Sequence, residues 1–138
     1  MDIFVTDSPE REHIELIDAG LDEYNLAQAG VVDHRKLAVL ARAPDTGEVV
    51  GGLIGRTSLG LLFVELLYLP AEYRGTGLGA QLLAAAEREA VNRGCRTGVL
   101  YTISFQAPDF YVKQGWQVFG EVPTDNGISR VFLSKTLG

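Results

Sequence analysis

The sequence has little cysteine and little histidine: among its 138 residues, Cys95 is the one cysteine, and His13 and His34 are the two histidines. A lone cysteine excludes an intrachain disulfide framework and a cluster of cysteine metal ligands. Two histidines so far apart in the sequence do not indicate a metal site either. We therefore expect the protein to work without a metal.

Long apolar runs and basic segments are also missing. No apolar stretch reaches the roughly 20 residues that a membrane-spanning helix needs, and residues 1–4 lack the basic segment of a secretory signal. We interpret the protein as cytoplasmic, with no membrane partner. Lys and Arg number 12 against 18 Asp and Glu, which gives a net charge of −6. An acidic chain without a basic patch disfavours nucleic acid as a partner.

What the sequence does contain fits one ordinary globular domain. Apolar residues make up 46% of the chain and charged residues 22%, as in typical globular proteins. A chain of this length buries roughly two-thirds of its unfolded surface on folding. We predict a single domain over residues 1–138.

Residues 62–69 form an apolar run in which Glu65 is the only charge, and Pro70 follows it. This pattern predicts a strand that is buried on both faces and ends at the proline. A helix is expected next, because apolar residues recur at helical spacing and Gly94 stands where a left-handed cap belongs. The helical stripe is Leu78, Leu82, Leu83, Ala86 and Ala90.

Strands and helices are expected on both sides of this central unit. Ser8 is a candidate helix N-cap with Pro9 at the first helical position, and Gly20 is expected to weaken that helix. The pattern as a whole predicts a mixed α/β sheet with helices on both faces. The other predicted elements are a strand at 2–6, the helix to about residue 27, a hairpin of 35–43 with 49–56, a strand at 97–103, a helix at 106–114, and a hairpin of 116–122 with 128–135.

Between the central strand and its helix stands Arg74, followed by three alternating glycines, Gly75, Gly77 and Gly79. Glycines let a ligand approach the backbone without meeting a Cβ. The unpaired N–H groups of a helix's first turn attract anions, and no acid lies in the first turns of this helix. Residues 74–80 are therefore predicted to bind a phosphate or pyrophosphate; the alternative is a flexible loop before an ordinary helix.

A dinucleotide site is a weaker interpretation of the same glycines. Gly75, Gly77 and Ala80 fit the spacing of the dinucleotide fingerprint, which by itself is weak evidence. That fingerprint normally follows the first strand of a parallel unit and has an acid ~20 residues later. Here the glycines fall at mid-chain, and residues 99–102 contain no acid.

Arg74, Gly77 and Gly79, after an apolar strand with Glu65, resemble the acyl-CoA pyrophosphate loop of the GNAT superfamily of N-acyltransferases. Residues 104–116, which read SFQAPDFYVKQGW, resemble that family's segment ending in Phe-Tyr-x-x-x-Gly-Phe. The two motifs stand in the family's order and at its usual separation. The resemblance implies a mostly antiparallel mixed sheet, flanked by helices on both faces. It also implies that this sheet opens before residues 97–103 to admit a pantetheine arm.

The resemblance also implies the cosubstrate, acetyl-CoA, and its site. Glu65 matches a strand glutamate that acts as a base, directly or through water; the alternative is a structural ion pair. Tyr111 matches a tyrosine that protonates the CoA sulfur; the alternative is a packed aromatic anchor. Ser104 matches a position that bonds the pantetheine, or else it caps a strand end. The implied acetyl-CoA contacts are Leu67, Tyr68, Leu69, Arg74, Gly75, Thr76, Gly77, Leu78, Gly79, Ala80, Ser104 and Tyr111.

We therefore expect an N-acetyltransferase that moves an acetyl group from acetyl-CoA to a primary amine of a small molecule or peptide by direct attack. The main alternative is a non-catalytic module that holds acyl-CoA as a sensor or scaffold. Many similar members carry an acid where this chain has Tyr101, and a histidine and a tyrosine where it has Ile128 and Val131. Their acceptor is therefore not carried over. The acceptor, the acyl-chain length and the oligomeric state, a homodimer included, stay open.

Overall fold

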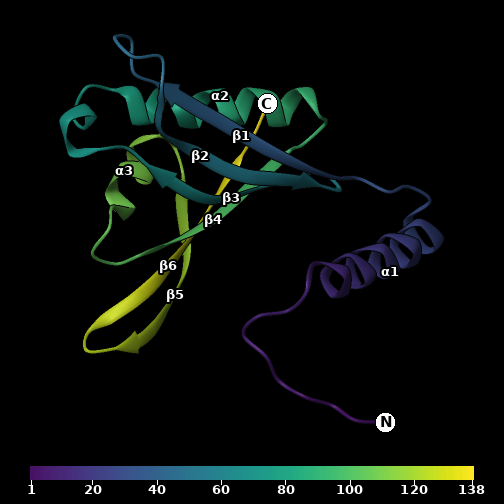
Figure 1. The fold of residues 1–138 in the computed structure, drawn as a ribbon. Coiled ribbons are helices and arrows are strands. Elements are labelled where there is room, and N and C mark those ends of the chain that lie inside the picture. The colour runs from purple at the N-terminus through teal and green to yellow at the C-terminus, as the bar shows by residue number, and fades with distance from the viewer. The chain divides into compact units, whose positions relative to one another are not determined.

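The computed structural model describes residues 1–138, and the chain forms two compact units, Met1–Asp33 and His34–Gly138 (Figure 1). That residues 1–138 form a single domain stays a prediction. No helix in either unit combines the length and the apolar character that crossing a membrane requires.

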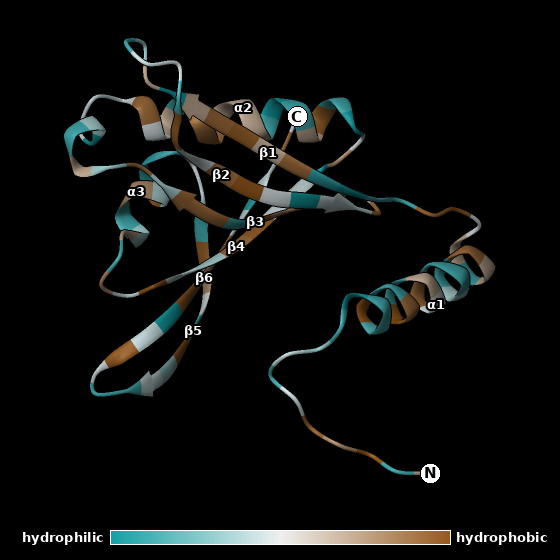
Figure 2. Ribbon diagram, in the orientation of Figure 1, coloured by the Kyte–Doolittle hydropathy of each residue, from teal (hydrophilic) through white to brown (hydrophobic).

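The first unit contains one helix, α1 (Arg11–Ala29), in which apolar (brown) and polar (teal) residues are interspersed (Figure 2). The strand expected at 2–6 does not form, and the helix start predicted at Ser8 is wrong. The Ser8 N–H instead donates to the Thr6 hydroxyl, and Glu10 is the N-cap. Such a local bond favours a turn over a helix. Gly20 does not interrupt the helix, because one interior glycine costs only about 1 kcal/mol.

The second unit is built on a six-stranded sheet in the order β1-β2-β3-β4-β6-β5. Its one parallel pair is β3 with β4, and all other neighbours run antiparallel. This confirms the predicted fold class, a mixed and mostly antiparallel sheet, and both predicted hairpins form. The strands are β1 (His34–Arg42), β2 (Val49–Ser58), β3 (Leu61–Tyr68), β4 (Thr97–Ile103), β5 (Gln117–Asp125) and β6 (Ile128–Thr136).

Two helices, α2 (Leu78–Asn92) and α3 (Pro108–Lys113), pack on the same face of this sheet. Most of the predicted stripe of α2 is buried there, namely Leu82, Leu83, Ala86 and Ala90. Phe110 and Tyr111 of α3 pack against the same core, which also contains Trp116. A short 3-10 helix, η1 (Ala71–Tyr73), lies between β3 and α2. The loop at residues 74–77 leads directly into α2, and Phe110 of α3 lies against Gly79 in the first turn of that helix.

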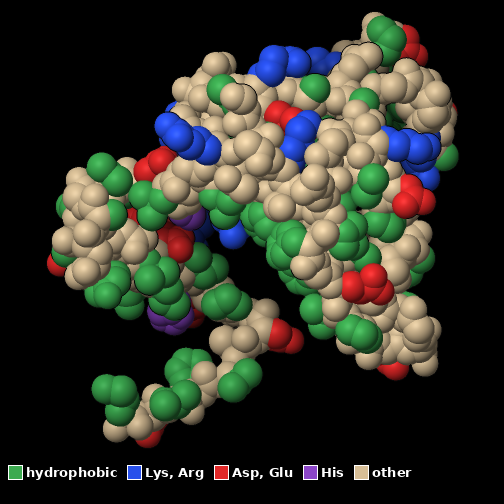
Figure 3. Space-filling model, turned by 180° about the vertical axis from the view of Figure 1, so that it is seen from behind, with side chains coloured by type: hydrophobic (Ala, Val, Ile, Leu, Met, Phe, Trp, Pro, Cys, Tyr) green, Lys and Arg blue, Asp and Glu red, His purple; other side chains and the backbone are tan.

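The strand β3 is not buried on both faces, so that part of the prediction is wrong. Leu62 and Val64 are buried on the α2 side, whereas Leu66 and Tyr68 are exposed. A continuous apolar run indicates a strand but does not show that helices of its own unit cover both sides. Other exposed apolar side chains lie along β5, which is one strand of the hairpin at the lower right of Figure 3.

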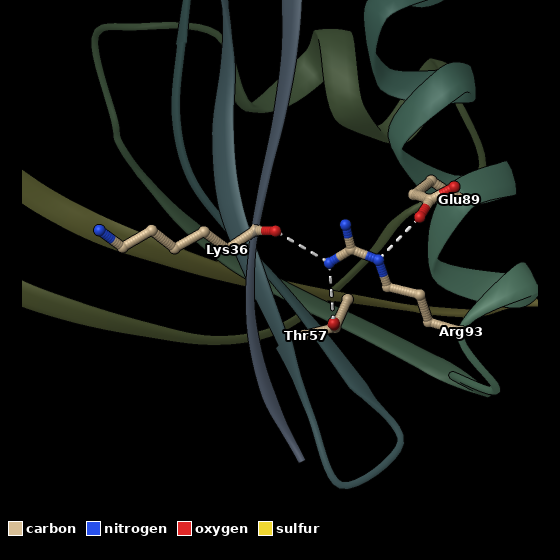
Figure 4. Close-up of polar contacts among 4 residues, drawn as sticks. All are labelled: Lys36, Thr57, Glu89 and Arg93. Carbon is tan, nitrogen blue, oxygen red and sulfur yellow. Dashed lines mark hydrogen bonds and ion pairs between the residues drawn. The ribbon is translucent and has the colours of Figure 1, made fainter. Parts of the chain in front are cut away.

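Arg93, just after α2, joins this helix to the sheet (Figure 4). Its guanidinium donates to the Glu89 carboxylate at 2.8 Å, to the Lys36 carbonyl oxygen at 3.0 Å and to the Thr57 hydroxyl at 3.1 Å. Hydrogen bonds from a charged donor are among the stronger ones. They fix the C-terminal end of α2 on β1 and β2. Because a helix is rigid, they also help to fix the position of its N-terminal end.

Candidate active site

A cavity of about 760 Å³ lies at the point where β3 and β4 separate. The two strands pair only from Leu61 with Thr97 to Val64 with Leu100, although β3 runs on to Tyr68 and β4 to Ile103. This is the opening that the family resemblance implies. The cavity is lined by Leu67, Tyr68, Leu69, Arg74, Gly75, Gly77, Gly79, Ala80, Thr102, Phe105, Gln106, Ala107, Phe110, Tyr111 and Gln114.

The loop before α2 forms the first wall of the cavity. Gly75 and Gly77 have φ angles of 76° and 85°, and a Cβ added to either would meet no atom within 4 Å. The helix begins at Leu78 with no side-chain cap and no acid in its first turn, so its first N–H groups are available to an anion. Arg74 Nε donates to the Leu69 carbonyl oxygen at 2.8 Å, which holds the guanidinium beside the loop. The loop is therefore a cradle of N–H groups with one full positive charge.

The two separated strands form the second wall, through Leu67, Tyr68, Leu69 and Thr102. Beyond Val64, the edge of β3 that faces β4 has no strand partner. Its backbone N–H and C=O groups need partners, and an extended ligand with amide groups can supply them as an added strand does.

The helix α3 forms the third wall, and Tyr111 is its central residue. The Tyr111 ring packs against Phe110 and Trp116, with ring centroids 5.1 and 6.4 Å apart. Its hydroxyl makes no hydrogen bond to the protein and is not fully buried, and Tyr111 is one of the residues that line the cavity. Burial raises the pKa of the Tyr111 hydroxyl above its ordinary value of 10.0. The group is therefore protonated at neutral pH.

Several lining residues were not predicted, and most of them belong to the segment 104–116. Ala107, Phe110, Tyr111 and Gln114 are spaced as i, i+3, i+4 and i+7, the spacing of one helix face. Helical periodicity applied to this segment would have identified that face. The unpredicted residues are Thr102, Phe105, Gln106, Ala107, Phe110 and Gln114.

Three predicted contacts do not line the cavity. The Thr76 hydroxyl donates to the Tyr73 carbonyl oxygen at 2.8 Å, and Leu78 packs against the buried group that includes Leu82. The Ser104 hydroxyl accepts a hydrogen bond from the Ser129 N–H at 3.1 Å, which joins the end of β4 to β6. The cosubstrate contacts expected of Thr76, Leu78 and Ser104 stay predictions.

Glu65 lies on the opposite face of the sheet and does not line the cavity. In the pairing of β2 with β3, Glu65 has no partner and forms a bulge between Val64 and Leu66. Its half-exposed carboxylate forms an ion pair with Arg56, whose guanidinium lies 4.5 Å from the centre of the Phe63 ring. The expectation of a buried acid is therefore wrong, because the bulge turns Glu65 toward the face that α2 and α3 leave uncovered. Glu65 is also the first β3 residue beyond the last β3–β4 pair, Val64 with Leu100, so it stands where the gap begins but on the face away from the cavity.

Comparisons with known proteins agree over most of the chain. Residues 1–116 match the model of the acetyltransferase (GNAT) family. Acetyltransferase Atu2258 of Agrobacterium fabrum is 37% identical over 136 residues, 98% of each chain. Blasticidin-S acetyltransferase of Streptomyces morookaense is 37% identical over 116 residues, 81% of this chain and 85% of that one. The crystal structure of an acetyltransferase from Bacillus cereus has a TM-score of 0.77 and 28% identity, covering 97% of this chain and 98% of that one.

Proposed function

The chain belongs to the GNAT family of acetyltransferases, and we propose that it moves an acetyl group from acetyl-CoA to a primary amine of a small molecule or peptide. GNAT acetyltransferases use acetyl-CoA. One observation carries the proposal: the cavity lies where β3 and β4 separate, and Glu65, the first β3 residue beyond their last pair, turns to the opposite face of the sheet. A donor in the cavity and an amine beside Glu65 would meet at the gap between these strands.

The donor's pyrophosphate would bind at residues 74–80. Two features support this assignment: the open backbone at Gly75 and Gly77, and the uncapped start of α2. Arg74 adds a positive charge there, and its Nε bond to Leu69 leaves its other N–H groups for the phosphates. The pantetheine amides would pair with the free edge of β3 at Leu67 to Leu69. A backbone N–H of this segment would also stabilise the carbonyl oxygen as it gains charge.

Transfer of the acetyl group has one requirement at each end. A lysine-like amine with a pKa near 10.4 must lose a proton, which costs about 4 to 5 kcal/mol at pH 7. The departing thiolate must gain a proton, and Tyr111 is the candidate donor because its hydroxyl is protonated and the residue lines the cavity. The base takes the first proton from the ammonium group, which leaves a neutral amine. As the C–N bond forms and the C–S bond breaks, the Tyr111 proton goes to sulfur, and the second N–H proton of the attacking nitrogen returns to the Tyr111 oxygen.

Glu65 is the candidate base. An ionised carboxylate accepts a proton from an ammonium group directly or through one water. Its position on the face away from the cavity supports a role toward the acceptor rather than the donor. The ion pair with Arg56 holds the carboxylate in place without burying it.

A module that binds acyl-CoA without turnover is the remaining alternative. An enzyme and a binding module would both need the cavity, so the features that distinguish them are Glu65 and the hydroxyl of Tyr111. A passive holder needs neither an acid beside the gap nor a phenol at the cavity. We therefore favour the enzyme.

The test is an assay of acetyl-CoA with a panel of amines that includes blasticidin S, small primary amines and short peptides, with release of free thiol as the signal. We expect turnover with at least one amine, and loss of that turnover in the double variant Glu65→Gln, Tyr111→Phe. The binding module would gain support if the folded protein binds CoA by calorimetry but releases no thiol with any amine.

A further inference from the structure

A second group of side chains lies on the sheet face opposite α2 and α3, which we call the open face of residues 34–138. It contains three charged residues from adjacent strands, Lys36 on β1, Arg56 on β2 and Glu65 on β3. Glu65 and Arg56 form an ion pair. Neither Lys36 nor Arg56 lines the cavity.

The charges on this group do not balance. Lys36 is the register partner of Arg56, so the two cations project side by side from the same face. Figure 4 shows the Lys36 side chain pointing away from Arg93 and α2. Lys36 makes no ion pair, and Glu65 alone offsets the two positive charges. One net positive charge is left for a ligand.

Aromatic side chains lie next to these charges. The Arg56 guanidinium lies over the Phe63 ring, and Phe63 leads to Tyr101 and then to Phe132, with centroid distances of 6.4 and 5.4 Å. Phe119 continues the row at 6.1 Å from Phe132. Tyr101 is 50% exposed and Phe119 is 60% exposed, so both rings present apolar surface to solvent.

We propose that the open face binds an acceptor that carries a carboxylate close to its amine, in the manner of an amino acid, with an apolar side group on the aromatic row. Arg56 and Lys36 bind the carboxylate, Glu65 receives the amine, and the ring of Tyr101 contacts the side group. This inference rests on the proposed acetyl transfer and narrows its acceptor to one chemical class.

The ion pair between Arg56 and Glu65 suits such an acceptor. Both side chains are partly exposed, 44% and 34%, and exposed ion pairs contribute little to stability. An incoming carboxylate therefore takes Arg56 from Glu65 at small cost. The same exchange frees Glu65 for the ammonium group, so an acceptor with both charges replaces one ion pair by two.

The first arm of the test compares acceptors that differ only in the carboxylate. L-phenylalanine, L-phenylalaninamide and phenethylamine are assayed with acetyl-CoA, as are the corresponding sets built on leucine and alanine. We expect kcat/KM for the acid to exceed that of the amide by at least about tenfold. The intrinsic reactivity of the two acceptors predicts the opposite order, with the amide faster than the acid. The amine of the amide resembles a peptide α-amino group with a pKa near 8 and loses its proton more readily.

The second arm uses variants of the two cations. Arg56→Gln and Lys36→Gln should each lower the acid-to-amide ratio, by about tenfold and about threefold. The matched control is Arg35→Gln, which removes a positive charge from the same strand but from the opposite face, and the ratio should not change. Equal loss with acid and amide in Arg56→Gln would mean that Arg56 only holds Glu65, and would overturn the proposal.

The third arm measures binding without chemistry, so that failure of acetyl transfer is seen separately. Each acid and its amide are titrated by calorimetry into the protein saturated with CoA. Selective binding of an acid that Lys36→Gln weakens supports the inference even when no thiol is released. If no acid binds, the proposal is wrong. If in addition light scattering shows a dimer that Tyr101→Ser dissociates, the open face is a surface between two copies of the chain.

Discussion

Replacing Tyr111 with phenylalanine distinguishes between two possible roles of this residue, a proton donor and a packed aromatic ring. The change deletes one hydroxyl and keeps the ring contacts with Phe110 and Trp116. Because the hydroxyl makes no hydrogen bond to the protein, we expect the free energy of unfolding to change by less than about 1 kcal/mol. The affinity for CoA should stay within about threefold, because the pyrophosphate cradle is untouched.

The turnover rate of Tyr111→Phe, in contrast, should fall by about 100-fold or more. A positioned general acid typically contributes 10²- to 10⁴-fold, which corresponds to about 3 to 5 kcal/mol of transition-state stabilisation. Thiol release gives the rate, calorimetry gives the CoA affinity, and chemical denaturation gives the stability. Tyr73→Phe, in the neighbouring 3-10 helix, is the matched control and should keep the full rate. A near-normal rate in Tyr111→Phe would refute the reasoning and leave Tyr111 as a packing residue.

Three further predictions follow from the same contacts. Glu65→Gln should preserve CoA binding by calorimetry and lower the rate with a suitable amine by about 100-fold, because the amide cannot accept a proton; a near-normal rate would exclude Glu65 as the base. Arg93→Met should lower the free energy of unfolding, measured by urea titration, by about 2 to 4 kcal/mol, because three hydrogen bonds are lost. The control variant Arg88→Met, on the exposed side of α2, should change it by less than about 0.5 kcal/mol. Burial raises the pKa of Tyr111 in the folded state, so above about pH 10 the unfolded chain loses this proton before the folded chain does. The wild type should therefore lose stability faster with rising pH than Tyr111→Phe, by at most about 1.4 kcal/mol per pH unit. Parallel stability curves for the two proteins would contradict the burial of this hydroxyl.

Much of the second unit was predictable because its signals are local. The strand at 97–103 has the predicted bounds, and the helix α2 forms over the predicted stripe and ends just before Gly94, since alternation, apolar spacing and glycine caps act within a few residues. The open loop before α2, where we propose that the pyrophosphate binds, was predicted for the same reason. Its signals are the glycines and the missing acid, which the sequence displays directly.

The environment of Glu65 was not predictable, because it depends on pairing between strands. The bulge that turns Glu65 outward is set by the register of β3 against β2, and a sequence pattern does not give that register. The partner, Arg56, is one strand away and had no motif of its own. The helix start at Ser8 failed for a different reason: the Ser8 hydroxyl, which would accept the helix N–H groups as a cap, lies 3.4 Å from the Thr6 hydroxyl, and the Ser8 N–H donates to that same hydroxyl.

The central claim is that CoA binds with its pyrophosphate on the loop before α2, and calorimetry of CoA with Gly77→Val tests it most directly. The branched side chain would enter the open space at this position, so affinity should fall by on the order of 100-fold or more, about 2.7 kcal/mol. Gly60→Val is the matched control, because Gly60 has a φ of 86°, close to the 85° of Gly77, an equally open Cβ position and no part in the cavity. It should suffer the same backbone strain and bind CoA like the wild type. Wild-type affinity in a folded Gly77→Val protein would contradict the account.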